Sequence, residues 1–170
     1  MSKVLRILVL TLMIAATAKA EMFDINITTA RKKLDEQKSH EGDKTSVTKE
    51  VVYTITLESH SFKPMTGLQI KYMIFYQDQQ PGNTGKPIIA FNKGTATLAG
   101  LGVHETANID TSSFKLTTTE LDAGWYYANG ASGRAQDRVT GVWVRVYSDG
   151  KLVGEYANPP STSKKNTWKE

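Results

Sequence analysis

Cysteine is absent from all 170 residues of the chain. Its absence excludes disulfide bonds, thiol catalysis and thiolate metal sites. It also excludes a bacterial lipoprotein anchor, because acylation requires a cysteine at the cleavage point. Stability must therefore come from a packed core, which a single domain of ~150 residues can supply.

Motifs for catalysis and metal binding are lacking as well. The sequence contains no HExxH zinc motif, no EF-hand loop and no G-x-S-x-G elbow. Its three histidines, His40, His60 and His104, are far apart. No cofactor is predicted. A hydrolase with dispersed residues remains an alternative, and its candidates by residue type alone are Glu105, Asp110, Glu120, Asp122 and Asp137.

No apolar run reaches the ~20 residues that a helix needs to cross a bilayer. The first twenty residues instead combine two basic residues, a short apolar run from Ile7 to Ala16 and the small-residue triplet Ala18-Lys19-Ala20. This order is typical of a secretory signal peptide. We therefore expect a signal-peptide helix at residues 1–20, and a soluble periplasmic or extracellular protein after cleavage, with no membrane span.

An excess of one charge is also missing from the exported part. Three of the 21 basic residues lie in the signal, so 18 basic residues face 17 acidic ones. Nucleic-acid binding by bulk electrostatics loses its support, because that binding depends on a strongly positive surface.

The mature chain alternates between apolar and polar residues with a period of two, which is typical of half-buried strands. The predicted strands lie at residues 23–28, 51–57, 68–77, 88–91, 95–101, 107–116, 139–148 and 152–156. They place one domain at residues 21–160, followed by a polar tail at 161–170.

The connections follow from charge and turn residues. Residues 31–44 are highly charged and are expected to form a solvated connection, and residues 121–138 form the longest irregular segment. The inward-facing residues occupy odd positions up to Thr111 and even positions from Phe114. A regular strand cannot make this change, so a bulge or bend is predicted near Ser112-Ser113. Asp149-Gly150 predicts a tight hairpin, since both central residues of the favoured turn need positive φ.

These features predict an all-β fold, an antiparallel two-sheet sandwich of seven or eight strands, with a small barrel as the alternative. Residues 51–57 and 67–72 resemble the second and third strands of exported bacterial immunoglobulin-like or fibronectin-III-like domains. Residues 142–156 resemble their last two strands. The resemblance is architectural and implies no activity, because such folds carry many unrelated functions.

An outward aromatic face is the first candidate site. Its members alternate with core positions along residues 68–76 and 142–146, so they point away from the core. In an immunoglobulin-like topology these two strands are neighbours. The predicted interaction surface is Met73, Phe75, Trp143, Arg145 and Tyr147. The chain could instead cover this surface itself, with residues 125–127 or with the tail that carries Trp168.

A second candidate is the aromatic loop segment. It combines three consecutive rings with a small-residue sequel and a nearby arginine, and comprises Trp125, Tyr126, Tyr127 and Arg134. The alternative is that these rings are buried in a corner of the core.

The sequence as a whole favours an exported noncatalytic module that binds an unknown protein partner or assembles with its own kind. A carbohydrate-binding module that stacks sugar rings on exposed aromatics is the alternative.

Overall fold

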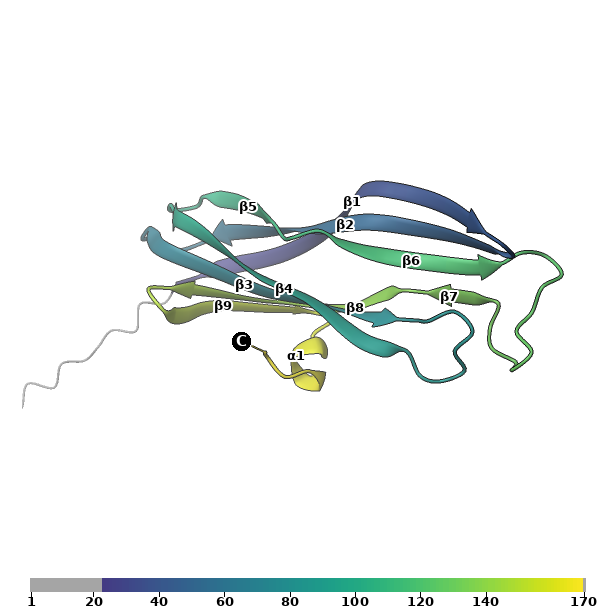
Figure 1. Cartoon of the computed structure of the whole chain (residues 1–170). Helices are drawn as coiled ribbons and strands as arrows, with labels where there is room; N and C mark the ends of the chain where they lie inside the picture. The colour runs from purple at the N-terminus through teal and green to yellow at the C-terminus, as the bar shows by residue number, and fades with distance from the viewer. Residues whose placement is uncertain (1–22, 170) are drawn as a thin grey trace, which may run out of the picture.

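Figure 1 shows the computed structural model of the chain, which describes residues 23–169. The elements are β1 (Ile25–Glu41), β2 (Lys44–Ser59), β3 (Met65–Asp78), β4 (Ile88–Leu101), β5 (Thr106–Asp110), β6 (Phe114–Leu121), β7 (Arg134–Gln136), β8 (Arg138–Ser148), β9 (Lys151–Asn158) and α1 (Thr162–Lys165). The predicted signal peptide lies outside the described residues. Within residues 23–169, no helix combines the length and the apolar character that crossing a membrane requires.

The strands form two antiparallel sheets in two layers (Figure 1). Sheet A has the order β1-β2-β6-β7, with β5 paired to β2 beyond the end of β6, and sheet B has the order β4-β3-β8-β9. The predicted all-β sandwich is confirmed. The described residues form nine strands, where seven or eight were predicted. The predicted strands 88–91 and 95–101 are one strand, and the predicted strand 107–116 is two. β7 is a short additional strand within the segment expected to be irregular.

The core lies between the central strands of the two sheets, and the predicted inward residues line it. The side chains of Ile55, Leu57, Ile70, Ile74, Val144 and Val146 are fully buried. Because side chains alternate across a strand, burial of this set turns the residues between them toward the outer faces. On β8, the three inward valines place Trp143 on the outer face of sheet B.

Residues 31–44 differ from the prediction of a solvated connection. β1 continues to Glu41 and pairs with β2 along nearly its whole length, apart from one irregularity at Leu34. A two-residue turn at Gly42-Asp43 joins them, with Gly42 at φ +62°, which suits the first central position of a hairpin turn. Alternation gave no signal here, because both faces of this half of β1 are exposed.

The predicted bend near Ser112 is confirmed. It separates β5 from β6, and each of these two strands pairs with a different half of β2. β5 pairs with Thr54–Glu58 and β6 with Lys44–Val51. Between them, the Thr111 hydroxyl accepts a hydrogen bond from the Tyr53 N–H (3.0 Å), and the Thr111 N–H donates to the Tyr53 carbonyl (2.9 Å). The Ser112 N–H donates to the Tyr72 hydroxyl (2.8 Å), so the bend also joins the two sheets.

The C-terminal part returns across sheet B. Asp149 (φ +48°) and Gly150 (φ +77°) form the predicted hairpin turn between β8 and β9. In the segment predicted to be a polar tail, α1 and the residues after it up to Lys169 lie against the outer face of sheet B (Figure 1). Gly141 makes this contact possible, because a Cβ at that position would overlap the Thr162 side chain.

Candidate functional site

The outer face of sheet B brings together the apolar residues that alternation predicted there. β3 and β8 are neighbours, and Met73 lies directly opposite Trp143. With Phe75 they form a second apolar cluster, separate from the core between the sheets. All three are buried, and Trp143 is only 4% exposed.

The cover over this cluster is the chain's own C-terminal segment. The Trp168 ring meets the Trp143 ring edge-on, with centroids 5.0 Å apart, and Ala157 on β9 packs beside them. Of the occupants considered for the predicted surface, the tail that carries Trp168 takes this place. Met73, Phe75 and Trp143 are therefore closed to a partner while the tail is docked.

A polar rim surrounds the two indoles. The Arg145 guanidinium lies 4.7 Å from the Trp143 ring centroid and 4.5 Å from that of Trp168. Its Nε donates to Glu155 Oε1 (2.7 Å), which also accepts from the Trp143 indole N–H (2.9 Å). Tyr147 lies further along β8. A cation held over aromatic faces and paired with a carboxylate fixes the rings in place.

This polar rim lowers the pKa of Glu155. Partial burial raises its pKa, but hydrogen bonds from Arg145 and Trp143 and the charge of Arg145 outweigh burial, so the pKa is lowered. A lowered native pKa stabilises the fold above the unfolded-chain glutamate pKa of about 4.3. That stabilisation is lost as the pH falls through the lower native pKa.

We therefore expect Glu155→Gln to flatten the acid limb of the stability profile. The melting temperature of the wild type should fall more between about pH 6 and pH 3 than that of the variant, because only the wild type protonates this carboxylate. Differential scanning calorimetry measures both. Glu41→Gln, at the exposed end of β1, controls for the loss of one negative charge. Equal falls for Glu155→Gln and wild type would contradict the expectation.

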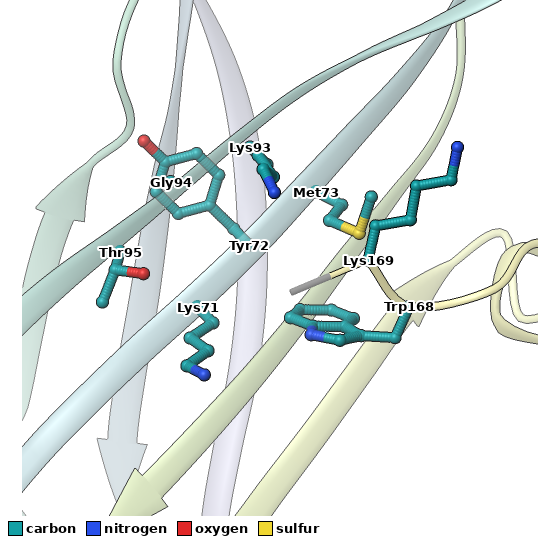
Figure 2. Close-up of a pocket in the computed structure, with 8 residues that line it drawn as sticks. All are labelled: Lys71, Tyr72, Met73, Lys93, Gly94, Thr95, Trp168 and Lys169. Carbon is teal, nitrogen blue, oxygen red and sulfur yellow. The ribbon is translucent and has the colours of Figure 1, made fainter.

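A cavity of about 250 Å³ opens beside the docked tail. Figure 2 shows Trp168 and Lys169 on one side of it, and strand residues of β3 and β4 on the other. Its cationic lining residues are Lys71, Lys93 and Lys169. The Lys71 ammonium lies 5.5 Å from the centroid of the Tyr147 ring, which places the last predicted surface residue at the edge of this basic region.

An exposed apolar strip lies on β4, and the sequence analysis did not identify it as a site. Ile88, Ile89 and Phe91 are 57%, 52% and 36% exposed. Phe91 lies opposite Phe75 (ring centroids 6.4 Å apart), and Ile89 shares its face, so these two residues continue the buried cluster outward to the edge of sheet B, while Ile88 lies on the opposite face of the strand. The sequence contains the uncharged apolar run Ile88-Ile89-Ala90-Phe91. It does not indicate that this run lies on the edge strand of a sheet.

The aromatic loop lies at the end of the sandwich that also carries the β1–β2 turn and the β3–β4 loop (Figure 1). Trp125 and Tyr126 are 64% and 83% exposed, so burial in a corner of the core does not apply to them. Tyr127 is partly buried and packs on Gly82, where an added Cβ would lie 3.1 Å from its ring. Arg134 begins β7, and its backbone N–H donates a hydrogen bond to the Ser132 hydroxyl (3.1 Å).

Hydrogen bonds hold this loop in position. The Asn129 side chain donates to the Gly82 carbonyl (2.9 Å), and the Asp122 N–H donates to the Asp43 carbonyl (2.9 Å). The Trp125 N–H donates to the Asp122 carbonyl (3.1 Å). The two exposed rings are therefore presented from an anchored loop.

The carboxylates considered for hydrolysis serve mostly in local structure. Asp137 accepts from the N–H groups of Gln79 (3.1 Å) and Thr117 (2.8 Å), and Asp110 accepts from Thr54 (2.6 Å). Glu105 accepts from the Gly102 N–H (2.5 Å). Glu120 is exposed on β6. Among residues 23–169, no three histidine or acidic side chains lie together as a metal site would require.

One histidine does lie near a hydroxyl and a carboxylate. His40 Nδ1 is 3.2 Å from Thr45 Oγ1 and 3.7 Å from Asp122 Oδ2, while the Thr45 hydroxyl donates to Asp122 Oδ1 (3.1 Å). A catalytic triad needs the acid to orient the base through its second nitrogen. Here the same nitrogen faces both groups, so the arrangement differs from a triad.

Comparison with known proteins adds no family. No protein-family model and no curated protein matches the chain. A Northeast Structural Genomics Consortium target is similar at 11% identity and a TM-score of 0.38, covering 78% of this chain and 84% of the other. A crystal structure from Akkermansia muciniphila is similar at 11% identity and a TM-score of 0.28, covering 85% and 78%.

Proposed function

We propose that this chain is an exported, noncatalytic β-sandwich that acts as a protein-interaction or self-assembly module outside the cytoplasm. The observation that carries the proposal is the exposed apolar edge of sheet B, where Ile89 and Phe91 share the outer face. Exposed contiguous apolar surface of this kind marks contact sites in proteins. The signal-like first twenty residues support export.

We further propose that the sandwich is of the immunoglobulin-like type. Constant-type domains place their first, second, fourth and fifth strands in one sheet and their third, sixth and seventh in the other, and variable-type domains add strands beside the third. With β5 and β6 counted as the two halves of a fifth strand and β7 as an addition, the pairing of this chain follows the same division except at β4. β4 departs from the constant-type arrangement, because it pairs with the third strand, as the added strand of a variable-type domain does. This pairing makes β4 an edge of sheet B.

Site-specific photocrosslinking tests the interaction function. A benzoylphenylalanine at position 89, incubated with envelope extract, should form a defined crosslinked product with a macromolecule. The same probe at Leu152, an equally exposed position (50%) on the outer face of β9, should not. The product should also disappear when Phe91→Lys is added. If positions 89 and 152 give the same products, the strip is not a contact site and the proposal fails.

Carbohydrate binding is a second candidate, favoured by the two exposed rings on the anchored loop. We expect glycan binding to require both Trp125 and Tyr126, because stacking on a sugar needs an open aromatic face. A Trp125→Ala/Tyr126→Ala variant should lose all signal on a glycan array. Phe62→Ala, which removes an exposed ring (89%) beyond the other end of β2, is the control. An array without signal for the wild type would eliminate this function.

A further inference from the structure

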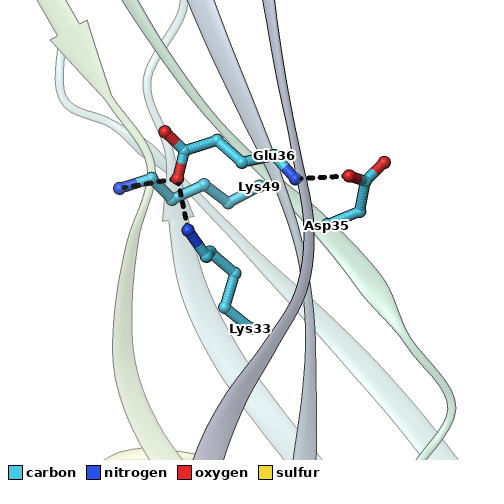
Figure 3. Close-up of polar contacts among 4 residues, drawn as sticks. All are labelled: Lys33, Asp35, Glu36 and Lys49. Atoms are coloured by element: carbon cyan, nitrogen blue, oxygen red, sulfur yellow. Dashed lines mark hydrogen bonds and ion pairs between the residues drawn. The ribbon is translucent and has the colours of Figure 1, made fainter.

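The edges of the two sheets are not equally protected against pairing with another strand. Native proteins blunt an exposed edge with charge, bulges, short length or a covering segment. β1 uses charge and an irregularity at Leu34. Figure 3 shows Lys33, Asp35 and Glu36 of this strand together with Lys49 of β2. Lys33 and Lys49 lie 2.9 and 3.9 Å from Glu36 Oε2, and the pKa of Glu36 is lowered, first by the Lys33 hydrogen bond.

The remaining edges apart from β4 are also protected. β7 has three residues and β5 has five. β9 has a register shift at Val153, and the start of β1 packs against it, since a Cβ on Gly154 would lie 2.6 Å from the Ile25 side chain. Each of these strands is therefore a poor template for an added strand.

In the part of the chain that the structure describes, the first half of β4, residues 88–91, lacks charge, bulges and a covering strand. The whole strand has fourteen residues, pairs with β3 without a register shift, and contains one charged residue, Lys93. Asn92 exchanges hydrogen bonds with Ser112 (3.1 and 3.2 Å), so the bend of sheet A occupies its middle. Before Asn92, β4 has no strand on its outer side among the described residues. A regular apolar edge without charged side chains is the kind that pairs with another chain.

We propose that the first half of β4 pairs antiparallel with the same segment of a second copy of this chain, joining the two copies of sheet B into one continuous sheet. This inference rests on the proposed interaction function and names its partner. A twofold axis at Ala90 would set Ile89 opposite Phe91 of the second copy, and Lys93 opposite Pro87. The apolar side chains of Ile89 and Phe91 would then meet on the outer face, and Lys93 would lie opposite an uncharged residue, as a self-complementary twofold contact requires.

Pro87 agrees with the extent of this pairing. Proline has no N–H to donate to a ladder, so pairing would end there on each copy. By symmetry about Ala90, the other end falls at Lys93, next to the Asn92–Ser112 contact. The Lys169 ammonium, which lies 4.9 Å from the Phe91 ring centroid, would move aside or stay at the rim of the joined sheet.

Sedimentation velocity from micromolar to millimolar concentration tests the inference. The wild type should shift from monomer to dimer as the concentration rises, and Ile89→Lys should weaken the dimer by about tenfold or more, because it buries a charge at the contact. Leu152→Lys is the matched control and should behave as the wild type. A wild-type protein that stays monomeric overturns the inference, and so does a dimer that Ile89→Lys leaves unchanged.

Cysteine crosslinking tests the register, since the chain has no other cysteine. Residues opposite each other in an antiparallel pair have Cα atoms about 4.5–5.5 Å apart, which suits a disulfide. Ala90→Cys should therefore form a covalent dimer under mild oxidation, and Ala99→Cys on the same strand should not. A dimer crosslinked equally by both overturns the twofold at Ala90. A monomer that crosslinks to another protein from position 89 overturns the inference but keeps the proposed function, and no product at all overturns both.

Discussion

Trp143→Ala is expected to lower the free energy of unfolding by about 3–5 kcal/mol, the usual cost of removing a buried large aromatic residue. Trp143 is 4% exposed and packs against Trp168 on one side and Met73 across the strand pair. Its removal leaves a cavity under the tail and removes the hydrogen bond that the indole N–H donates to Glu155. Urea denaturation followed by far-ultraviolet circular dichroism measures the change.

Trp125→Ala is the matched control for this prediction. It removes the same side chain from a position that is 64% exposed, and surface substitutions usually change stability by less than about 0.5 kcal/mol. Trp168→Ala should fall between the two, because the Trp168 side chain is only partly buried. Equal losses for Trp143→Ala and Trp125→Ala would show that the tail does not cover the outer face of sheet B.

Gly94→Ala is expected to destabilise the fold by about 1–3 kcal/mol, the range for forcing extra volume into a packed site. A Cβ at Gly94 would overlap the Tyr72 hydroxyl and lie 2.5 Å from the ring carbon that bears it. The ring cannot move away easily, because it is 4% exposed and its hydroxyl accepts the Ser112 N–H (2.8 Å). The midpoint of urea unfolding should therefore fall.

Gly133→Ala adds the same methyl group where there is room. The nearest atom to its Cβ would be Leu121 Cβ at 3.8 Å, an ordinary contact, and Gly133 is not among the glycines with positive φ. Stability should be unchanged, or raised by up to about 1 kcal/mol through the loss of disorder in the unfolded chain. A Gly94→Ala protein as stable as Gly133→Ala would show that Tyr72 does not cross β4 at this point.

Alternation predicted the central strands well, because burial of one face imposes a period of two on the sequence. It located the inward faces of β2, β3 and β8, and from β8 it placed Trp143 on the outer side. The parity change before Phe114 located the bend, since a strand cannot change face without one.

Elements without a buried face could not be found in this way. The second half of β1 is held by backbone pairing to β2 alone, and its charged side chains resemble those of a loop. Gly94 lies in the gap between the predicted strands 88–91 and 95–101, although it is part of one continuous strand and leaves space for a ring on the neighbouring strand. Such roles depend on which strands are adjacent, and composition does not contain that information.

The cover over the outer face was one of several possibilities in the sequence, and the strip at the edge was not among the predicted sites. A single tryptophan in a polar segment indicated that residues near position 168 could pack somewhere. The exposure of Ile89 and Phe91 depended on β4 being the last strand of sheet B. Both the covering of the outer face by the tail and the exposure of β4 depend on the order of strands in sheet B. That order is set by pairing between residues far apart in the sequence.

The β1–β2 hairpin extends well beyond the core. On β1, core contacts end at Ile27, and residues 29–41 are almost entirely solvent-exposed. Backbone hydrogen bonds without apolar packing open locally at low energetic cost, so amide protons in this arm should exchange with deuterium long before those of β3 and β8. The molecule thus has a rigid body and a pliant arm, and proteolytic nicking would begin at the arm.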